Sequence, residues 1–405
     1  MDKEGILSGI RVIEVATYVF GPGAATVMSD FGAEVIKVER PKIGDTYRYL
    51  SSLPPMPAAE MNYCWILDGR NKKSVALDLS SEEGRDILLQ MIATADVFLT
   101  NYQPSVLEKL KLRYEDVEAI NERLIYAHAT GYGEKGDEVE KPGFDMTAYW
   151  ARSGLMDAVH NSDAEPALSV AAMGDHPSAM AMFGGIMLAL YKRQQTGRGT
   201  KVSSSLMANG AWANSCLIQA ALCNAIPYQH RTRATAINAL VNHYVTRDEK
   251  RFIFCLIQPD DWMRLFKAIG HNELLTDERF TTLEARIQNA PALIAIMDKA
   301  IAAKDMAEWA QIFAEYALSW SPVQTILEVA EDQQMQANDV FVEFEHSKHG
   351  RLRTINSPIF LRGEEKVKPQ TAPEIGQHTV EILQSLGYDE TAIAQLLERG
   401  IAATS

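Results

Sequence analysis

Short apolar runs and longer amphipathic segments alternate along the first 130 or so residues of the chain. The run Arg11–Val15 predicts a buried strand, Ala24–Phe31 a helix and Glu34–Val38 a second strand, with Gly32 ending the helix. Two strands joined through a helix within about 30 residues are parallel, because a parallel connection needs a crossover of a dozen residues or more. The pattern therefore predicts a βαβ unit at the start of the chain.

The same alternation continues beyond this unit. Strands are expected at Val75–Leu79, Val97–Thr100 and Leu124–Ala129, and Ser81 is expected to cap a helix that runs to about Ala95. Strands that alternate with helices are typical of the α/β class, here a large Rossmann-like domain with a doubly wound parallel sheet. Ligands of such sheets lie beyond the carboxyl ends of the strands.

The pattern changes near residue 226. Tyr244–Thr246 and Phe252–Ile257 predict a hairpin, and helical segments follow it, including Asp261–Ile269, Ala292–Ala303 and Met306–Tyr316. We expect three parts: a large α/β domain over residues 1–225, a smaller α+β domain over 226–330, and a segment 331–405 that returns to the large domain.

The last 75 or so residues predict one more hairpin and two helices. Val340–Phe344 alternates like an antiparallel strand and is expected to pair with Leu352–Ile355. Gly387 suits the position just after a helix and Asp389 the N-cap of the next one, so the two closing helices are expected to separate there.

Composition narrows the class of protein. The 405 residues are 47% hydrophobic and 23% charged, as in ordinary globular proteins. No run approaches the roughly 18 apolar residues of a membrane span, and the polar start is unlike a signal or transit peptide, so we expect no membrane partner and a cytoplasmic protein. The four cysteines form no C-x-x-C pair and no ligand cluster, which favours free buried thiols over a disulfide framework or a metal site.

The formal net charge of −14 argues against nucleic acid as a partner. An anionic ligand would therefore need a local group of basic side chains. The chain offers three such groups, most simply explained as solvated surface charge: Arg40 with Lys42; Arg70 with Lys72 and Lys73; and Lys109 with Lys111.

One carboxylate, Asp175, lies where an apolar run meets an apolar helix. Leu168–Met173 is short enough for a buried strand, and Ala179–Tyr191 is long enough for a helix that begins after Pro177. Asp175 is then either a helix N-cap or a nucleophilic or proton-transferring carboxylate at a strand end. Its position does not decide between the two interpretations.

Other candidate sites are less specific. The loop Gly21–Ala25, with Glu39 after the second strand, suggests a dinucleotide site, but the third glycine is missing, and a tight turn explains the glycines equally well. The segment Gly131–Gly136 lacks the Gly-Lys-Ser/Thr ending of a phosphate-binding loop. His128 lies inside an apolar strand and is expected to be a satisfied core residue, whereas His176 adjoins Asp175 and is a possible acid–base group.

Several segments together resemble the class III CoA-transferases, the family of formyl-CoA transferase and the carnitine CoA-transferases. Their order and spacing are specific, and they run nearly from end to end of the chain. They are Gly9–Glu14, the Gly21-Pro22 turn, Phe31–Glu39, Asn71–Asp78, Asn101–Pro104, Gly174-Asp175, Thr196–Gly199, Gly376–Thr379 and Leu386–Tyr388.

The resemblance implies that Asp175 is a nucleophile. The carboxylate would attack an acyl-CoA thioester and pass through an aspartyl anhydride and an aspartyl-CoA thioester, so that CoA moves to a free carboxylic acid without ATP. A helix N-terminus beside Asp175 is expected to help keep the acid ionised near neutral pH. Coenzyme A and acyl-CoA would be substrates rather than permanently bound cofactors.

The resemblance also implies which residues contact CoA. By motif position these are Val19, Arg40, Leu77, Asn101, Lys109 and Tyr132. Lys109 stands where an arginine is common in the family, so a bidentate phosphate contact would become a point charge.

Within the family, the sequence favours transfer over other chemistry. The related α-methylacyl-CoA racemases, the runner-up, use a Gly-His-Asp motif that here reads Gly143-Phe144-Asp145, and phenylalanine cannot shuttle a proton. The glycine-rich loop of formyl-CoA transferase has no equivalent, since Asn238–Tyr244 holds no glycine. A binding or structural protein without catalysis is a third possibility.

Several motifs resemble the branch of the family that acts on 2-hydroxy acids. An acyl pocket could be lined by Phe144, Tyr149, Trp150 and Trp212, although core packing explains most of them. The family architecture further implies an intertwined homodimer of interlocked rings.

Overall fold

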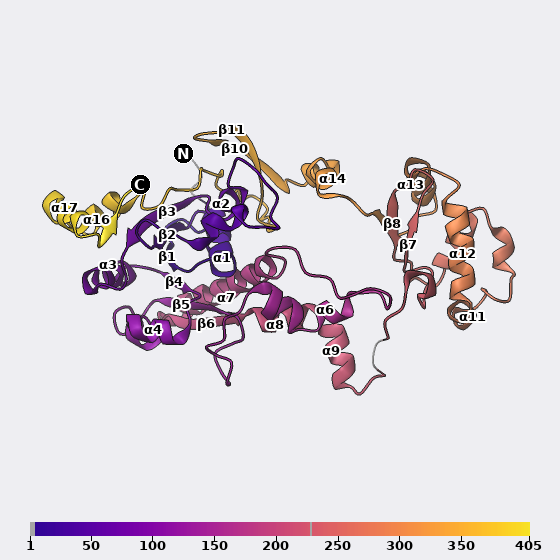
Figure 1. Cartoon of the computed structure of the whole chain (residues 1–405), viewed down its shortest axis with the longest axis horizontal. Helices are drawn as coiled ribbons and strands as arrows, with labels where there is room; N and C mark the ends of the chain where they lie inside the picture. The colour runs from indigo at the N-terminus through magenta and orange to yellow at the C-terminus, as the bar shows by residue number, and fades with distance from the viewer. Residues whose placement is uncertain (1–4, 227–228) are drawn as a thin grey trace. The chain divides into compact units, whose positions relative to one another are not determined.

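The computed structural model describes residues 5–226 and 229–405. The chain divides into two compact units (Figure 1). The larger comprises Met1–Asp157, Leu168–Ala225 and Met335–Ser405, and the smaller comprises Ala158–Ala167 and Ile226–Gln334. Residues 158–167, which we expected in the large domain, therefore belong to the smaller unit.

A seven-stranded sheet forms the centre of the larger unit, in the order β12–β3–β2–β1–β4–β5–β6. All neighbouring pairs from β3 to β6 are parallel, and β12 is antiparallel to β3. The strands are β1 (Arg11–Val15), β2 (Glu34–Glu39), β3 (Lys72–Leu77), β4 (Val97–Thr100), β5 (Ile125–Thr130), β6 (Thr200–Ser205) and β12 (Ala402–Ala403). The predicted α/β class with a large parallel sheet is confirmed.

Two strand predictions differ from the structure. The segment Leu168–Met173 is no strand but loop and turn, with Leu168 and Val170 more than 70% exposed. The edge strand next to β5 is instead β6, whose sequence Thr-Lys-Val-Ser-Ser-Ser is too polar to show as an apolar run. Local hydrophobicity failed in both cases because it does not show which segment pairs with the sheet edge.

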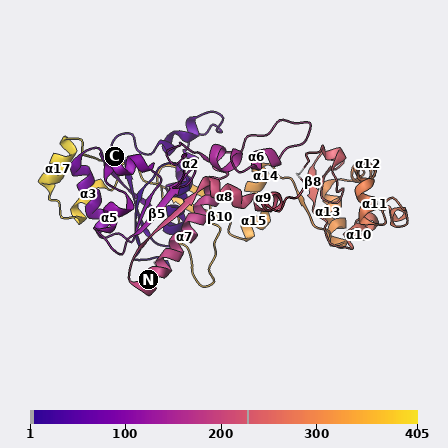
Figure 2. The same ribbon diagram turned by 90° about the horizontal axis from the view of Figure 1, so that it is seen from below.

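Helices cover both faces of this sheet. The helices α1 (Phe20–Asp30) and α7 (Asp175–Thr196) pack on one face, and Figure 2 shows α7 running along β5. The other face is covered by α3 (Glu82–Ala93), α4 (Pro104–Leu110), α5 (Tyr114–Glu118), α16 (Thr379–Ser385) and α17 (Glu390–Glu398). Helices α16 and α17, yellow in Figure 1, thus lie beside α3 although nearly 300 residues separate them in sequence.

The first helix starts earlier than its sequence predicts. Gly21 and Gly23 lie inside α1 and are buried, so neither a tight turn nor a dinucleotide loop is present there. A Cβ atom on Gly21 would lie 3.1 Å from Cβ of Ala16, and one on Gly23 would lie 3.1 Å from Cβ of Ala179. The glycines therefore allow α1 to approach its own strand and α7 closely.

The smaller unit is an α+β structure built on the three-stranded antiparallel sheet β7–β8–β9. The predicted hairpin is confirmed as β7 (His243–Val245) and β8 (Arg251–Phe254), and β9 (Trp320–Pro322) pairs with β8. The helices α10 (Asp261–Ala268), α12 (Ala290–Ile301) and α13 (Met306–Glu315) supply most of its apolar core.

The C-terminal predictions are confirmed. β10 (Phe341–His346) pairs antiparallel with β11 (Gly350–Ile355), Gly387 has a φ of 93°, and the Asp389 side chain caps α17. The remaining helices are α2 (Tyr63–Asp68), α6 (Leu155–Ala158), α8 (Leu206–Ala213), α9 (Ser215–Leu222), α11 (Leu283–Gln288), α14 (Ile326–Ala330) and α15 (Gln333–Ala337), with short 3₁₀ or π turns at Thr46–Ser52, Asp145–Ala151, Arg233–Thr235 and Asn272–Leu275.

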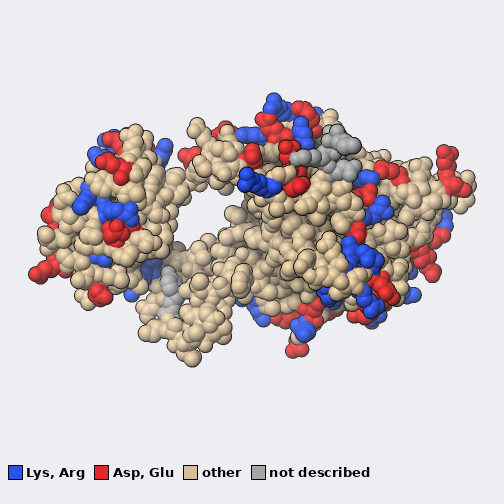
Figure 3. Space-filling view, turned by 180° about the vertical axis from the view of Figure 1, so that it is seen from behind, with Lys and Arg blue, Asp and Glu red and all other residues tan. Residues whose placement is uncertain are grey.

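Surface features qualify the predictions from composition. Among the described residues no helix is long and apolar enough to cross a membrane. The cysteines are free, but only Cys64 is buried, whereas Cys216, Cys223 and Cys255 are exposed. On the face seen in Figure 3, acidic and basic side chains are interspersed over the larger unit.

Candidate functional site

Asp175 is the first residue of α7. Gly174 occupies the N-cap position and makes no side-chain cap, so the interpretation of Asp175 as the N-cap is wrong. The partly buried carboxylate accepts no hydrogen bond from any residue that the structure describes. Both of its oxygens are therefore free for chemistry.

The residue before Asp175 is held tightly. The backbone nitrogen of Gly174 donates a hydrogen bond of 3.2 Å to Oδ2 of Asp145, which begins the π turn Asp145–Ala151. A Cβ atom on Gly174 would lie only 2.4 Å from Cγ of Tyr149 in that turn. Glycine is therefore required here by close approach, and this contact fixes where α7 begins.

The surroundings of Asp175 disfavour its charge. Burial, followed by the negative charge of Asp145, raises the pKa of Asp175 to about 7, although the charge of His176 opposes the rise. The expected help of the helix N-terminus in ionising this acid thus stands against burial and a like charge, which together raise the pKa. Near pH 7 the carboxyl group exists in both protonation states.

His176, the next residue, points to a buried acid. Its Nε2 atom lies 3.2 Å from Oδ1 of Asp68 in α2, and the hydroxyl of Tyr47 donates to Oδ2 of Asp68 at 2.6 Å. Burial alone would lower the pKa of His176, but the hydrogen bond and charge of Asp68 raise it above its ordinary value. Tyr47 and Asp68 carry no local sequence signal, since they belong to other segments and come near His176 only in the fold.

The other candidate histidine is structural, as predicted. His128 is 3% exposed, its Nδ1 lies 2.6 Å from Oε1 of Glu134, and its Nε2 lies 2.9 Å from the carbonyl oxygen of Tyr102. Both ring nitrogens are therefore used within the protein, and none remains for a substrate.

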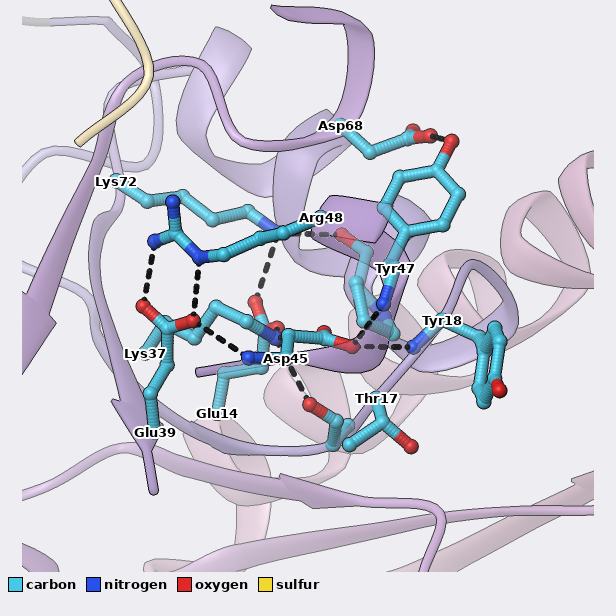
Figure 4. A network of polar contacts seen from close by, with 12 residues as sticks. Glu14, Thr17, Tyr18, Lys37, Glu39, Asp45, Tyr47, Arg48, Asp68 and Lys72 are labelled. Carbon is cyan, nitrogen blue, oxygen red and sulfur yellow. Dashed lines mark hydrogen bonds and ion pairs between the residues drawn. The ribbon is translucent and has the colours of Figure 1, made fainter. Parts of the chain in front are cut away.

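A buried ionic network supports the loop after β1 (Figure 4). Lys37 lies 2.6 Å from Glu14 and 2.7 Å from Asp45, and Lys72 lies 2.8 Å from Glu14. Oδ1 of Asp45 accepts a hydrogen bond of 3.1 Å from the backbone nitrogen of Tyr18, which has a φ of 62°. The network thus holds a left-handed residue at the carboxyl end of β1.

Five of the six predicted CoA contacts lie at the carboxyl edge of the sheet. Leu77 ends β3, Arg40 follows β2, Val19 follows the loop after β1, Asn101 follows β4, and Tyr132 follows β5. The sixth, Lys109, is exposed on α4, the helix that follows β4. The fold therefore arranges these residues along one edge although they are spread over more than 100 positions of the sequence.

The side chains of the predicted CoA contacts differ in their exposure and in whether the protein already occupies their hydrogen-bonding groups. Leu77 is fully buried in the core, and Val19 is 2% exposed. Both amide atoms of Asn101 bond the backbone of Thr17, at 3.0 and 2.7 Å. Arg40 is exposed, and its charge, with that of Lys37, opposes the rise that burial causes in the pKa of Tyr102.

A pocket of about 410 Å³ opens at the point where the strand order reverses, between β1 and β4. Thr17 and Tyr18 line it from one side and Asn101 and Tyr102 from the other. Phe144, 52% exposed, also lines it and packs edge-to-face on Tyr18. In open α/β sheets ligands bind at such a switch point.

A second cavity, of about 930 Å³, was not predicted from the sequence. His176 and Asp68 lie in its wall, together with residues of α1, α7 and the segment 337–360. None of the four aromatic candidates lines it: Tyr149 and Trp150 are buried elsewhere, and Trp212 is 81% exposed. Core packing is therefore the wrong explanation for Trp212 and Phe144.

These features describe an α/β fold with a pocket at the switch point of its sheet and with a carboxylate, that of Asp175, that accepts no hydrogen bond from the described residues. The chain belongs to the CoA-transferase family III, which it matches over residues 7–379, and it is a CoA-transferase. The relatives include (R)-2-hydroxy-4-methylpentanoate CoA-transferase of Clostridioides difficile, 33% identical over 96% of this chain and 97% of that protein. Cinnamoyl-CoA:phenyllactate CoA-transferase of Clostridium sporogenes is also 33% identical, over 98% of this chain and 97% of its own.

Solved structures agree with this assignment. A CAIB/BAIF family protein from Brucella suis superposes with a TM-score of 0.82 at 27% identity, covering 95% of this chain and 100% of that one. The Rv3272 protein of Mycobacterium tuberculosis gives a TM-score of 0.80 at 27% identity, covering 94% of this chain and 100% of that one.

Proposed function

We propose that the enzyme moves CoA from an acyl-CoA to a free carboxylic acid by covalent catalysis on Asp175. The observation that carries the proposal is the position of this carboxylate: it starts α7, is partly buried and has no hydrogen-bond donor among the described residues. A carboxylate that is neither capped nor paired retains its nucleophilicity.

The chemistry proceeds in two matched halves. An oxygen of Asp175 attacks the thioester carbonyl carbon, the C–S bond breaks, and CoA leaves as a thiolate from an acyl–aspartyl anhydride. The thiolate then attacks the aspartyl carbonyl, which releases the donor acid and leaves an aspartyl-CoA thioester. The acceptor carboxylate attacks this thioester, and the thiolate attacks the acceptor's carbonyl in the resulting anhydride, which regenerates Asp175. Every intermediate remains an activated acyl group, so the energy of the thioester is conserved.

The raised pKa of Asp175 suits a group that alternates between charged and neutral forms. Acylation replaces the carboxylate by a neutral anhydride or thioester, and a partly buried site stabilises the neutral form relative to the charged one. The same burial would limit access of water to the intermediates, which water would hydrolyse.

For CoA we propose the carboxyl edge of the sheet, with Val19, Arg40, Leu77, Asn101, Lys109 and Tyr132 as its contacts. Arg40 and Lys109 are exposed and supply positive charge for phosphates. Val19, Leu77 and Asn101 are occupied by packing or hydrogen bonds, so they would shape the loops and offer backbone atoms. No cofactor is required beyond CoA itself as a substrate.

We propose 2-hydroxy acids as the substrates and a homodimer as the working form. The first inference rests on two relatives whose names specify (R)-2-hydroxy-4-methylpentanoate and phenyllactate. The second is supported by large apolar side chains that the larger unit leaves open, since a second copy of the chain would cover them. They include Leu188 (72% exposed), Trp212 (81%) and Leu222 (72%).

An isotope experiment tests transfer against the racemase alternative. The enzyme is incubated in deuterated water with cinnamoyl-CoA and phenyllactate, and separately with a 2-methylacyl-CoA. We expect a new CoA ester of phenyllactate and no deuterium at the α-carbon of the 2-methylacyl group. Deuterium at that carbon without any exchange of acids would refute the proposal.

A further inference from the structure

The second cavity, of about 930 Å³, meets the region of Asp175 at His176. Its wall is mostly apolar, from Val27 of α1, Met180 of α7, and Val340 and Phe360 of the C-terminal segment. Such a cavity is large enough for a carboxylic acid with a branched aliphatic or an aromatic chain, since ligand pockets typically span about 300–1,000 Å³.

The cavity has two basic side chains in its wall, and only one of them is available. Arg70 is 4% exposed, and its guanidinium donates to both oxygens of Asp30, at 2.9 and 2.7 Å, and to the carbonyl oxygen of Leu67 at 2.5 Å. His176 differs, because 42% of its side-chain surface is exposed. A ligand carboxylate in the cavity can therefore pair with His176.

The two ring nitrogens of His176 have different surroundings. Nε2 faces Asp68, whose side chain is 4% exposed and whose other oxygen accepts the Tyr47 hydroxyl. Within the described residues Nδ1 has no hydrogen-bond partner, so in the imidazolium form, which Asp68 favours, its N–H remains for a ligand. The ring also lies against Gly23, where a Cβ atom would be 3.8 Å from Cδ2 of His176.

The reaction needs a cation at this place. The attacking group, the donor acid on release and the acceptor acid on entry are all carboxylates. Three ionisable groups act on the charge of Asp175, and two of them, Asp145 and Asp68, are acids. His176 is the third, and it is the only one that would attract a second carboxylate to Asp175.

We propose that His176, oriented by Asp68 and Tyr47, binds the carboxylate of the acid substrate through Nδ1, while the 930 Å³ cavity holds the branched or aromatic chain of that acid. This inference rests on the proposed transfer through Asp175 and adds the place and the chemical class of the acid. The same place would hold the donor acid as it leaves and the acceptor acid as it enters.

Steady-state kinetics with H176Q test the inference, with 2-hydroxy-4-methylpentanoate as acceptor and cinnamoyl-CoA as donor. Glutamine keeps a hydrogen-bond donor but loses the charge, so we expect the KM of the acid to rise about 10- to 100-fold, as for loss of a charged hydrogen bond. The KM of the thioester, which has no carboxylate at the reacting carbon, should stay within about twofold. H271Q is the matched control, because His271 pairs with Glu273 on the surface of the smaller unit and should change neither constant.

Two further variants keep the test open if H176Q folds poorly. Y47F removes only the hydroxyl that orients Asp68 and should raise the same KM by a smaller factor. M180W fills the cavity and should reduce kcat/KM for 2-hydroxy-4-methylpentanoate more than for glycolate, whereas Q194W at an exposed position of the same helix should not.

Equal loss of kcat in both half-reactions with unchanged KM for the acid would overturn the inference, because it would make His176 a support of Asp175 only. An unchanged ratio of kcat/KM for 2-hydroxy-4-methylpentanoate to kcat/KM for glycolate in M180W would overturn the part that concerns the cavity. Formation of the aspartyl-CoA adduct from donor alone is measured in parallel with the wild-type enzyme. Its absence would refute the covalent mechanism itself, independently of how acids bind.

Discussion

The carboxylate of Asp145 accepts a hydrogen bond of 3.2 Å from the backbone nitrogen of Gly174, so this buried acid anchors the residue directly before the partly buried Asp175. This contact brings the negative charge of Asp145 close to Asp175. Asp145 thus helps to position Asp175 through the hydrogen bond, and its negative charge opposes the ionisation of Asp175. The contact therefore links the geometry of the site to its pH dependence.

The decrease of kcat/KM at acid pH, the acid limb of the pH profile, should reflect protonation of Asp175. Because burial and Asp145 raise the pKa of Asp175 to about 7, kcat/KM should fall about tenfold for each pH unit below 7, where the neutral acid cannot attack. D145N removes the like charge, so the limb should move to lower pH. D86N, at an exposed position of α3, should leave the acid limb unchanged. A limb that stays in place in D145N would show that Asp145 does not set the pKa of Asp175.

Replacement by alanine should have opposite effects at Gly174, the N-cap of α7, and at Gly184 inside the helix. In G174A the new Cβ atom would meet Tyr149 at 2.4 Å, so the start of α7 must shift, and kcat should fall by roughly 100-fold, as for a misplacement of about 1 Å. In G184A the Cβ atom would have nothing within 4 Å, and the helix should gain about 0.5–1 kcal/mol. Circular dichroism melts and steady-state rates measure both effects. Similar activity in the two variants would contradict the close contact with Tyr149.

The buried network under the β1 loop should be a main source of stability. In E14Q, Lys37 and Lys72 would lose their shared carboxylate in a fully buried place, which should cost about 3–5 kcal/mol of unfolding free energy. E381Q removes an exposed partner of Lys73 and should cost less than about 1 kcal/mol. Urea unfolding of both variants makes the comparison, and equal losses would show that burial of the network does not matter.

Acidification should also lower the free energy of unfolding that this network contributes. Burial would raise the pKa of Glu14, but the charges of Lys37 and Lys72 hold it below its ordinary value. The stabilisation is therefore present above the ordinary pKa of a glutamate and is lost as the pH falls through the lower, folded value. The stability difference between the wild-type enzyme and E14Q should shrink at acid pH. A constant difference would indicate that Glu14 is not charged in the fold.

Arg40 should contribute to binding of CoA through its charge. R40A should raise the KM of an acyl-CoA about tenfold, as for loss of a charged hydrogen bond, and less at high salt. The same variant should show an unchanged KM for the matching acyl-pantetheine, which lacks the nucleotide phosphates. A rise for both thioesters would instead indicate a general disturbance of the loop after β2.

The sequence predicted most of the sheet because its strands are short, apolar and separated by capped helices. β1, β2 and β4 lie within one residue of their expected ranges, and Ser81 caps α3 as expected. Prediction failed where burial and local hydrophobicity disagree. β6 is polar yet paired with β5, and the apolar segment 168–173 is exposed in the single chain.

The site was predictable only in part. Asp175 stands out because it precedes a long apolar helix, and the strand ends indicate the edge where CoA would bind. Asp68, Tyr47 and Asp145 carry no local signal, since each acts on residues 21 or more positions away. The raised pKa of Asp175 was also out of reach, because it results from burial by segments that meet only in the folded chain.

The most direct measurement of the central claim is to trap the covalent intermediate. The enzyme is mixed with an acyl-CoA, reduced with borohydride or treated with hydroxylamine, digested and analysed by mass spectrometry. We predict that the peptide containing Asp175 carries the corresponding alcohol or hydroxamate, that no other carboxylate does, and that D175N gives neither modification nor transfer. Full transfer activity in D175N, or modification of a different acid, would contradict the account.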